Sequence, residues 1–584
     1  MKKFVLLLLM VIIGLVNCTK NSDSNAINQK HYRVVMQNLD GDFSACSQFY
    51  SYVCSKWLDK HLDGDYTSMM DMIHYSGNVE VKKYLENTSF GDMPNYAKLV
   101  KNFYKSCKES QEYQPLELMH RLEKEENMTW ALLTPVKNEE RLTFDWPSTM
   151  ATFRKYGFND MLVDQWSSIH DDFEYVTESN MESLNTSITL PADTIDFMEL
   201  WQQIDEFENK FAEVKAKQRT EKVYKFNELP YGWLKKYLTA LVPAEKLYDN
   251  RKFRVRNTVC MEGLDKLLQQ YDDKFLCRYL EVRFLLHLEK ANRRATPHEC
   301  LLQSTSLLNP AMEGIHLQLH PELLDEIPQI KQMFENIVKS VNKTLQMAKD
   351  EAIVPQEIFT KLGMMKLQVG NFPPLEKATE ILTTFYKNLN LQNNDYYGNY
   401  LKLLKFHYEL ESQGPGNIKL ETFSNTATYS ITNWDTNLSY DDNNNLLRVP
   451  FAVLRPPMYH LAYERIFKHS SLGVFMALRM FDLFYLMDDS NTRDVSNLSY
   501  LTSLNSALEV FLPSLQSEVE AGRLQTMFNM TSVQQLKQMF FINAVHCFCE
   551  NNDEDAEVVN YMLMNMSEFI DAFDCKFTRF YKKF

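Results

Sequence analysis

The sequence is poor in the residues that interrupt helices. It holds 16 glycines and 19 prolines among 584 residues, about half of what average usage of roughly 7% and 5% would give. Because both residues are unfavourable inside helices, this scarcity predicts a mainly α-helical protein. The glycine-rich phosphate-binding patterns G-x-G-x-x-G and G-x-x-x-x-G-K-[ST] are both missing from the sequence. It therefore offers no support for nucleotide binding.

An excess of positive charge is lacking as well. The chain carries 62 Lys and Arg against 77 Asp and Glu, a net charge of -15. A protein that binds nucleic acid needs a basic face to neutralise phosphates. We therefore expect no nucleic-acid partner.

Long apolar runs are absent except at the start of the chain. The apolar residues 4–16 follow Lys2 and Lys3 and precede a polar stretch. As a helix at about 1.5 Å per residue this run spans roughly 20 Å, which is too short for a bilayer core of about 30 Å. We predict a signal peptide over residues 1–18, cleaved near Cys18, and a secreted, extracellular protein whose mature chain has no transmembrane segment.

Secretion gives meaning to two other patterns. Sequons of the N-x-[ST] type make eight asparagines candidates for glycosylation: Asn87, Asn127, Asn185, Asn342, Asn437, Asn497, Asn529 and Asn565. Beyond the predicted signal peptide the chain has nine cysteines: Cys46, Cys54, Cys107, Cys260, Cys277, Cys300, Cys547, Cys549 and Cys575. An odd number leaves one thiol free or one bridge to another chain.

Apolar spacing divides the chain into three parts. Residues 99–410 show helical periodicity with few breaks, and a second helical segment runs from about Tyr459 to the end. Between them, residues 413–445 are rich in breakers and in alternating Thr, Ser, Tyr and Asn, which favours loops and short strands.

Seven short segments resemble the motifs of one family, in the same order. Residues 45–57 (A-C-S-Q-F-Y-S-Y-V-C-S-K-W), 103–107 (F-Y-K-S-C) and 279–283 (Y-L-E-V-R) are similar to P-C-x-D-F-Y-x-Y-A-C-G-x-W, F-Y-x-S-C and the end of N-Y-L-x-W-R. Residues 437–440 (N-L-S-Y), 449–457 (V-P-F-A-V-L-R-P-P), 538–549 (Q-M-F-F-I-N-A-V-H-C-F-C) and 569–575 (F-I-D-A-F-D-C) resemble N-A-[FY]-Y, F-P-A-G-I-L-Q-P-P, Q-L-F-F-L-x-F-A-Q-x-W-C and F-x-x-A-F-x-C. The chain thus resembles the neprilysin and endothelin-converting-enzyme family of zinc metallopeptidases over nearly its whole mature length.

The resemblance implies a fold and a covalent framework. The fold is a two-lobed ectodomain, with a linker over 19–44, a large helical domain over 45–425 and a degenerate, thermolysin-like metallopeptidase domain over 426–584, interlinked by disulfides. The implied bridges are Cys46–Cys575, Cys54–Cys549 and Cys107–Cys300. A fourth bridge between Cys260 and Cys277 is a further expectation, and Cys547 is then the odd thiol.

The catalytic motif of the family is lost. Where the family carries H-E-x-x-H, this chain reads Leu478-Arg479-Met480-Phe481-Asp482. Leu478 and Asp482 replace the two zinc ligands, and Arg479 replaces the glutamate that activates the metal-bound water. The family's third ligand, in E-N-x-x-D, has no counterpart between Asp482 and Gln538. The resemblance therefore implies no catalytic residue, no metal ligand and no cofactor, with the zinc lost.

Substrate binding in the manner of the family is only partly kept. Asn437 retains the side chain that would hold a peptide backbone, although it also begins a sequon. Val558 stands where the family has an arginine that grips the substrate carbonyl, and the segment with the family's late histidine is missing.

Two other groups of residues resemble metal sites and are assigned other roles. His316 and His320 are one helical turn apart with Glu322 following, but Pro321 breaks the helix and no third partner is evident, so we expect a structural or surface role. Cys547 and Cys549 lie next to His546 and could suggest a metal cluster. In an oxidising compartment, however, cysteines form disulfides, and Cys549 matches a disulfide cysteine of the family, so we expect no metal site here.

These observations predict a pseudoenzyme of the neprilysin type that binds peptides or a secreted or cell-surface protein. Two alternatives stay open. One is an active secreted zinc metalloendopeptidase that cleaves small peptides, or another hydrolase. The other is a purely structural glycoprotein.

Overall fold

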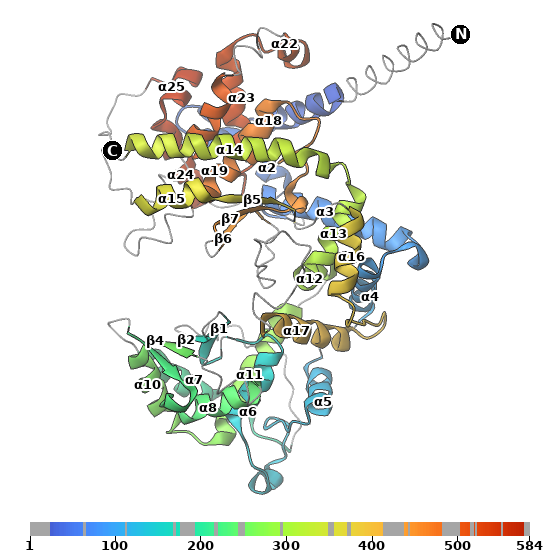
Figure 1. Ribbon diagram of the computed structural model, residues 1–584, viewed down its shortest axis with the longest axis vertical. Helices are drawn as coiled ribbons and strands as arrows, with labels where there is room; N and C mark the ends of the chain where they lie inside the picture. The colour runs from blue at the N-terminus through green and yellow to red at the C-terminus, as the bar shows by residue number, and fades with distance from the viewer. Residues whose placement is uncertain are drawn as a thin grey trace. The chain divides into compact units, whose positions relative to one another are not determined.

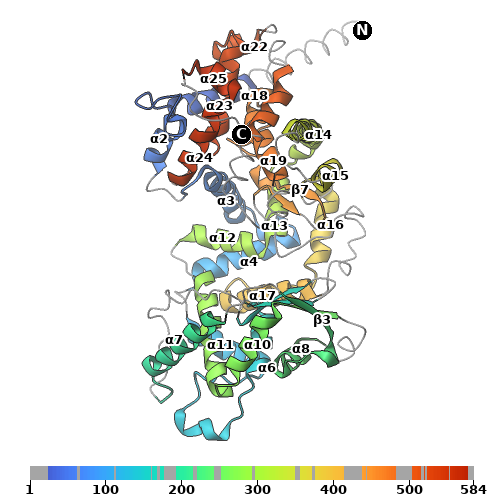
Figure 2. The same cartoon turned by 90° about the vertical axis from the view of Figure 1, so that its left-hand side faces the viewer.

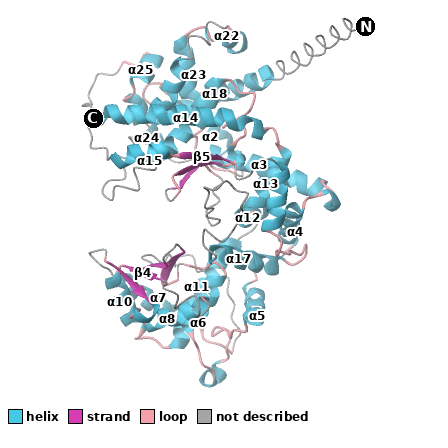
Figure 3. Ribbon diagram, viewed as in Figure 1, coloured by secondary structure: helices cyan, strands magenta, loops and turns pink. Residues whose placement is uncertain are grey.

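The computed structural model describes residues 24–61, 66–110, 114–159, 161–167, 171–175, 193–214, 220–242, 252–292, 296–348, 356–370, 375–412, 437–441, 444–481, 503–513, 519, 522–550 and 553–576. Helices make up most of this part of the chain (Figure 3), which confirms the mainly α-helical fold class. The predicted signal peptide (1–18) and the predicted domain boundary at 425/426 lie outside the described residues.

The chain divides into two compact units. Unit 1 combines residues 1–88, 310–380 and 435–584, and unit 2 combines residues 89–309 and 381–434. Unit 1 is therefore assembled from both ends of the chain and a central insert. Within the described residues, none of the helices combines the length and the apolar character needed to cross a membrane.

Unit 2 is a helical body with one sheet. Its helices are α4 (Asn95–Glu109), α5 (Pro115–Glu126), α6 (Trp146–Lys155), α7 (Phe197–Glu213), α8 (Gly232–Leu241), α10 (Thr258–Leu268), α11 (Asp273–Asn292), α12 (Pro297–Leu307) and α17 (Tyr396–Ser412). Residues 275–285 of α11 are buried on every side. The three charged residues in this stretch have hydrogen-bond partners that offset their burial: Glu281 accepts from the Ala131 amide, Arg278 donates to the Ala131 carbonyl, and Arg283 donates to the Met161 carbonyl. Helix α11 is therefore the centre of this unit.

The sheet of unit 2 was not predicted from the sequence. Its strands are β1 (Val163–Ser167), β2 (Asp171–Tyr175), β3 (Glu221–Lys225) and β4 (Lys252–Arg256), in the order β1-β2-β4-β3. Strands β2 and β4 run parallel, and the two outer pairs are antiparallel. The strands are five residues each and lie between long helices, so their alternation is too short to stand out against the helical pattern.

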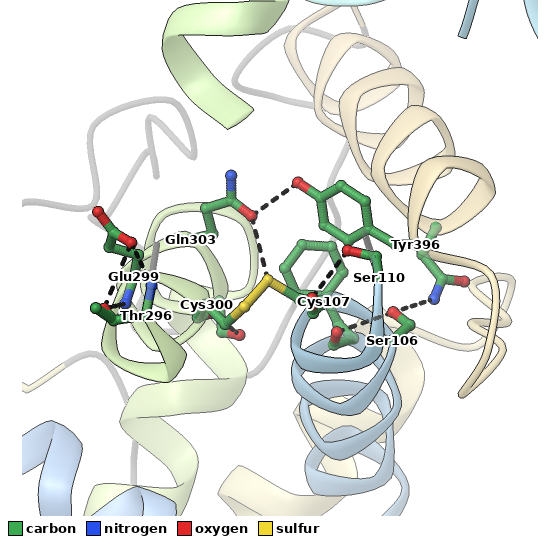
Figure 4. The surroundings of a disulfide bond; sticks show 11 residues. Ser106, Cys107, Ser110, Thr296, Glu299, Cys300, Gln303 and Tyr396 are labelled. Atoms are coloured by element: carbon green, nitrogen blue, oxygen red, sulfur yellow. Dashed lines mark hydrogen bonds between the residues drawn. A yellow bond between two sulfur atoms is a disulfide. The ribbon is translucent and has the colours of Figure 1, made fainter. Parts of the chain in front are cut away.

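One disulfide joins α4 to α12 in unit 2. Cys107 and Cys300 are bonded, with their Cα atoms 5.8 Å apart, within the usual range for a bridge. Figure 4 shows Gln303 beside it, where its Oε1 accepts a hydrogen bond from the Tyr396 hydroxyl at 2.9 Å and lies 3.8 Å from Cys107 Sγ. The bridge therefore fixes α12 against α4 and, through Gln303, against α17.

Unit 1 contains the remaining helices and a second sheet. Its helices are α2 (Phe49–His61), α3 (Met69–Asn87), α13 (Asn309–Leu319), α14 (Leu323–Ala348), α15 (Gln356–Met364), α18 (Arg465–Lys468), α19 (Val474–Met480), α22 (Arg523–Phe528), α23 (Val533–His546), α24 (Asp553–Met564) and α25 (Ser567–Phe573). Residues 24–37 and 503–513 are also helical, and the division between the units falls within α16 (Leu375–Phe385).

Both ends of the chain meet in the core of unit 1. Helix α23 is buried from Met539 to His546 and packs against α2 and α25, as Figures 1 and 2 show. Two disulfides close this core, Cys46–Cys575 with a Cα separation of 5.5 Å and Cys54–Cys549 with 5.3 Å. All three bridges implied by the family resemblance are thus present, and each joins residues of one unit.

The expected fourth bridge is not formed. Cys260 in α10 and Cys277 in α11 are free and buried. Cys260 Sγ faces the carbonyl oxygen of Val214 at 3.8 Å, whereas Cys277 Sγ faces Thr149 Oγ1 at 3.7 Å. The pairing was wrong because the two helices point their thiols at different neighbours and not at each other. Cys547 is a third buried free thiol.

Candidate functional site

The sheet of unit 1 carries the predicted peptide-binding residue. Its strands are β5 (Lys366–Val369), β6 (Ser439–Asp441) and β7 (Leu446–Val449), in the order β5-β7-β6, with β6 antiparallel to β7. Asn437 is exposed just before β6, and the next residue, Leu438, is buried. Burial of Leu438 anchors the start of the strand and leaves Asn437 at the edge of the sheet.

His74 of α3 positions the Asn437 side chain. His74 Nε2 donates to Asn437 Oδ1 at 2.7 Å. With its oxygen occupied in this way, the Asn437 amide still has an NH₂ group that can donate to a further partner. Burial lowers the pKa of His74, so the imidazole is neutral at physiological pH.

Arg455, whose charge also acts on His74, connects three segments of unit 1. Its Nη1 donates to Glu80 Oε2 at 3.1 Å and its Nη2 donates to His316 Nδ1 at 3.2 Å. Helix α3 passes close to this guanidinium at Gly77, where a Cβ atom would lie 2.8 Å from Arg455 Cζ. A larger residue at position 77 would therefore require the Arg455 guanidinium to shift.

His316 and His320 serve this cluster and have the structural role that we expected. Burial lowers the pKa of His316 to about 3, so its neutral ring accepts from Arg455. His320 contacts Glu80 at 3.0 Å and Glu322 at 3.1 Å through its two ring nitrogens. Hydrogen bonding to Glu80 raises the pKa of His320, and in return the pKa of Glu80 falls to about 2.

The described part of the degenerate catalytic motif lies at the end of a helical segment that contains a π-helical turn. Helix α18 continues through a π-helical turn, His469–Gly473, into α19. Leu478 is buried in the last turn of α19, with 5% of its surface exposed, and Arg479 is half-buried. Asp482 lies outside the described residues.

Helix α19 packs against β6 and β7 and against α14. The structure therefore brings the helix that carries Leu478 and Arg479 against the strand that follows Asn437. Among the described residues, no three His, Cys, Asp or Glu side chains gather in a way that could hold a metal ion.

Six of the eight sequons fall on described residues. Asn87, Asn127, Asn437, Asn529 and Asn565 are exposed, and Asn342 in α14 is half-buried. Asn185 and Asn497 lie outside the described residues. Glycans on the exposed positions would be compatible with the folded surface.

The sequence analysis missed the roles of His74, Glu80 and Arg455. Only Arg455 carried a signal, because it stands where the family's F-P-A-G-I-L-Q-P-P motif has glutamine. His74 and Glu80 occur in α3, where no motif singles them out, and their partners are more than 200 residues away.

Comparison with known proteins agrees with this architecture. Residues 45–228 match Peptidase family M13. The zinc metalloprotease Zmp1 of Mycobacterium tuberculosis, solved with an inhibitor, has a similar structure at a TM-score of 0.61 and 12% identity, covering 92% of this chain and 96% of that one. PepO from Lactobacillus rhamnosis gives a TM-score of 0.62 at 12% identity, covering 91% and 97%.

The chain has the fold of an M13 zinc metallopeptidase. A third structure with this fold, the galactose-containing glycoprotein complex of Haemonchus, matches at a TM-score of 0.61 and 15% identity, covering 94% of this chain and 96% of that one. The resemblance seen in the sequence is therefore confirmed at the level of the M13 fold.

Proposed function

We propose that this protein is a secreted pseudopeptidase, which has the M13 fold without its zinc chemistry and binds extended peptides at strand β6. The chemistry of the residues at the motif positions carries this proposal. Leu478 has no lone pair to give to a metal, and the guanidinium of Arg479 stays protonated and can neither bind zinc nor accept a proton. A catalytic zinc site needs about three protein ligands. The residues aligned with the ligands therefore do not fit a zinc ion.

Peptide binding is supported by the position of β6. Strand β6 lies at one end of the described sheet, with Asn437 at its start. An extended peptide can add to such an edge through main-chain hydrogen bonds, and a side-chain amide held in place can fix its register. His74 supplies that support, because it occupies the Asn437 oxygen and so orients the amide nitrogen.

We expect the purified protein to contain no stoichiometric zinc and to leave peptide substrates of M13 peptidases intact. Restoring the motif with Leu478→His, Arg479→Glu and Asp482→His should not create a peptidase, because the third ligand would still be absent. Plasma mass spectrometry measures the zinc content of the purified protein, and a peptide-cleavage assay measures the activity of the natural protein and of the triple variant. About one zinc per natural chain, with turnover that a chelator abolishes, would instead establish the active metallopeptidase.

Asn437→Ala is expected to weaken binding of captured peptides about tenfold, since it removes a hydrogen bond worth about 1.4 kcal/mol. The probe is a library of short synthetic peptides, enriched on the immobilised protein, identified by mass spectrometry and then titrated individually. Ser439→Ala is the matched control, because it removes the same sequon and leaves Asn437 in place.

The comparison of these two variants separates the alternatives. Retained binding by Ser439→Ala and loss by Asn437→Ala would support the role of the Asn437 side chain. Equal peptide affinity of both variants would show that the Asn437 side chain does not contribute to peptide binding. No enrichment of any peptide, with a glycan found on Asn437, would favour a structural glycoprotein.

A further inference from the structure

The helix at residues 24–37 buries a polar face. The buried positions of this helix are Asn28, His31 and Val35, with 0%, 6% and 0% of their surface exposed, and Asn38, the residue that follows the helix, is 3% exposed. Only one of these four side chains is apolar. Hydrogen bonds therefore act together with the apolar packing of Val35, Ile27 and Tyr32 to hold this helix on unit 1. We call residues 24–38 the N-terminal latch.

The first part of the latch is held by backbone groups. Asn28 Nδ2 donates to the carbonyl oxygen of Ala462 at 2.6 Å, and Asn28 Oδ1 accepts from the Glu464 amide at 2.8 Å. Ser24 Oγ donates to the same Ala462 oxygen at 3.2 Å. These contacts do not titrate.

His31 occupies the middle of the latch in a defined protonation state. Asn543 Nδ2 donates to Ser470 Oγ at 2.8 Å, so Asn543 Oδ1 is the atom that faces His31 Nε2 at 2.8 Å. His31 Nε2 must then donate, and His31 Nδ1 accepts from the Tyr463 hydroxyl at 3.0 Å. The geometry fits a neutral imidazole.

At the end of the latch, Lys60 fixes the direction of a second chain of hydrogen bonds. The Lys60 ammonium can only donate, and it donates to Asn38 Oδ1 at 2.9 Å. Asn38 Nδ2 therefore donates to His546 Nε2 at 2.9 Å, which leaves the His546 proton on Nδ1. That nitrogen is buried and has no hydrogen-bond partner among the described residues.

A proton on His546 Nε2 would oppose this arrangement. It would point at the Asn38 amide hydrogens, and rotating the amide would point those hydrogens at the Lys60 ammonium. Burial lowers the pKa of His546 to about 3 and that of His31 to about 4. Among the other titratable groups, Lys60 acts on His546, the Tyr463 hydroxyl is hydrogen-bonded to His31, and Cys547 acts on Tyr463.

We propose that residues 24–38 are a proton-operated latch, which is docked on unit 1 at neutral pH and released in an acidic compartment. In the docked state both histidines are neutral, whereas in the released state they regain ordinary pKa values of about 6.5. The released state therefore binds more protons below about pH 6.5, and docking weakens by up to about tenfold per pH unit for each histidine. Above that pH the docking equilibrium is independent of pH.

Hydrogen exchange measured by mass spectrometry on the full chain tests the latch between pH 7.5 and 4.5, with labelling times corrected for the intrinsic rate at each pH. Peptides from residues 24–38 should lose protection as the pH falls, while peptides from α14 in unit 1 and α11 in unit 2 stay protected. Protection of residues 24–38 that persists at pH 4.5 would overturn the proposal, and so would its loss together with α14.

The variant Lys60→Met tests whether Lys60 controls the protonation of His546 or only stabilises the fold. Lys60→Met removes the hydrogen bond to Asn38 Oδ1 and also the charge that disfavours protonated His546. Because the freed Asn38 amide can then rotate and accept a proton from charged His546, the second effect should dominate at low pH, and the midpoint of release should move to lower pH by at least about half a unit. Lys60 is exposed, so the variant should fold. No shift, or a shift to higher pH, would overturn the proposal.

Two further variants complete the test. Lys56→Met on the same helix loses the bond from Lys56 Nζ to the Leu39 carbonyl, 2.6 Å long, and should move release to higher pH. His31→Gln with His546→Gln keeps neutral groups at both positions. This double variant should hold the latch closed at pH 4.5, and release at the natural midpoint would contradict the role of the histidines.

Discussion

Removing both bridges of unit 1, by Cys46→Ala and Cys575→Ala together with Cys54→Ala and Cys549→Ala, is expected to lower its free energy of unfolding by about 10 kcal/mol. A loss of this size is as large as the whole stability of a typical domain. Far-UV circular dichroism and urea unfolding of the refolded variant at pH 7 should show unit 1 largely unfolded, with unit 2 retained.

Removing one bridge at a time should cost much less, because the bridges are nested. Their sequence separations are 529 and 495 residues, so with either bridge intact the other closes an effective loop of only about 34 residues, worth about 4 kcal/mol on the chain-entropy account. The effects of the two single removals should therefore sum to less than the effect of the double removal. Equal single effects that add up to the double effect would show that the bridges act independently.

The bridge of unit 2 provides the control. Cys107→Ala with Cys300→Ala opens a loop of 193 residues and should cost about 5 kcal/mol in unit 2 alone. The stability of unit 1 should be unchanged.

Gly370→Ala is expected to lower the free energy of unfolding of unit 1 by about 4 kcal/mol or more. Gly370 follows β5 with φ of +61°, and an added Cβ would overlap the ring of Phe451. That ring is buried, with 1% of its surface exposed, so it has little room to move. The Gly370 amide also donates to the Val449 carbonyl at 2.8 Å, so the sheet that carries Asn437 should be disturbed as well. Urea unfolding should show the lower stability of unit 1, and peptide titration should show weaker peptide binding.

Gly363→Ala is the matched control for this change. Gly363 lies in α15, only seven residues earlier, and an added Cβ there meets no atom within 4 Å. Alanine is the better helix former, so this variant should be neutral or more stable by up to about 1 kcal/mol. A similar loss of stability in both variants would rule out the overlap with Phe451 as the cause.

The sequence carried enough information for the M13 fold and three disulfides, because cysteines and aromatic motifs keep their order along the chain. It did not distinguish a bridge from two separate thiols at Cys260 and Cys277. A spacing of 17 residues says how far apart two thiols are along the chain, whereas pairing depends on the direction in which each helix points them. Cys260 and Cys277 point toward Val214 and Thr149 instead.

The N-terminal latch could not be read from hydrophobic periodicity. We predicted a linker over 19–44, and residues 24–37 of that segment are helical. The inward face is spaced like that of a packed helix, but Asn28, His31 and Asn38 are polar, so an apolar pattern is absent. The partners of these side chains follow more than 400 residues later, and only the tertiary structure brings them together.

The same long-range connection gives the polypeptide the topology of a closed ring. Cys46 is bonded to Cys575. After a single cut at any peptide bond between them, the disulfide therefore still holds the two fragments together as one molecule. A protease that cleaves the segment over 413–436 would therefore produce two bands on a reducing gel and one band on a non-reducing gel. Cys46 and Cys575 lie side by side, with their Cα atoms 5.5 Å apart. A short peptide could therefore join the chain at these two positions while new termini are opened elsewhere, as in a circular permutant.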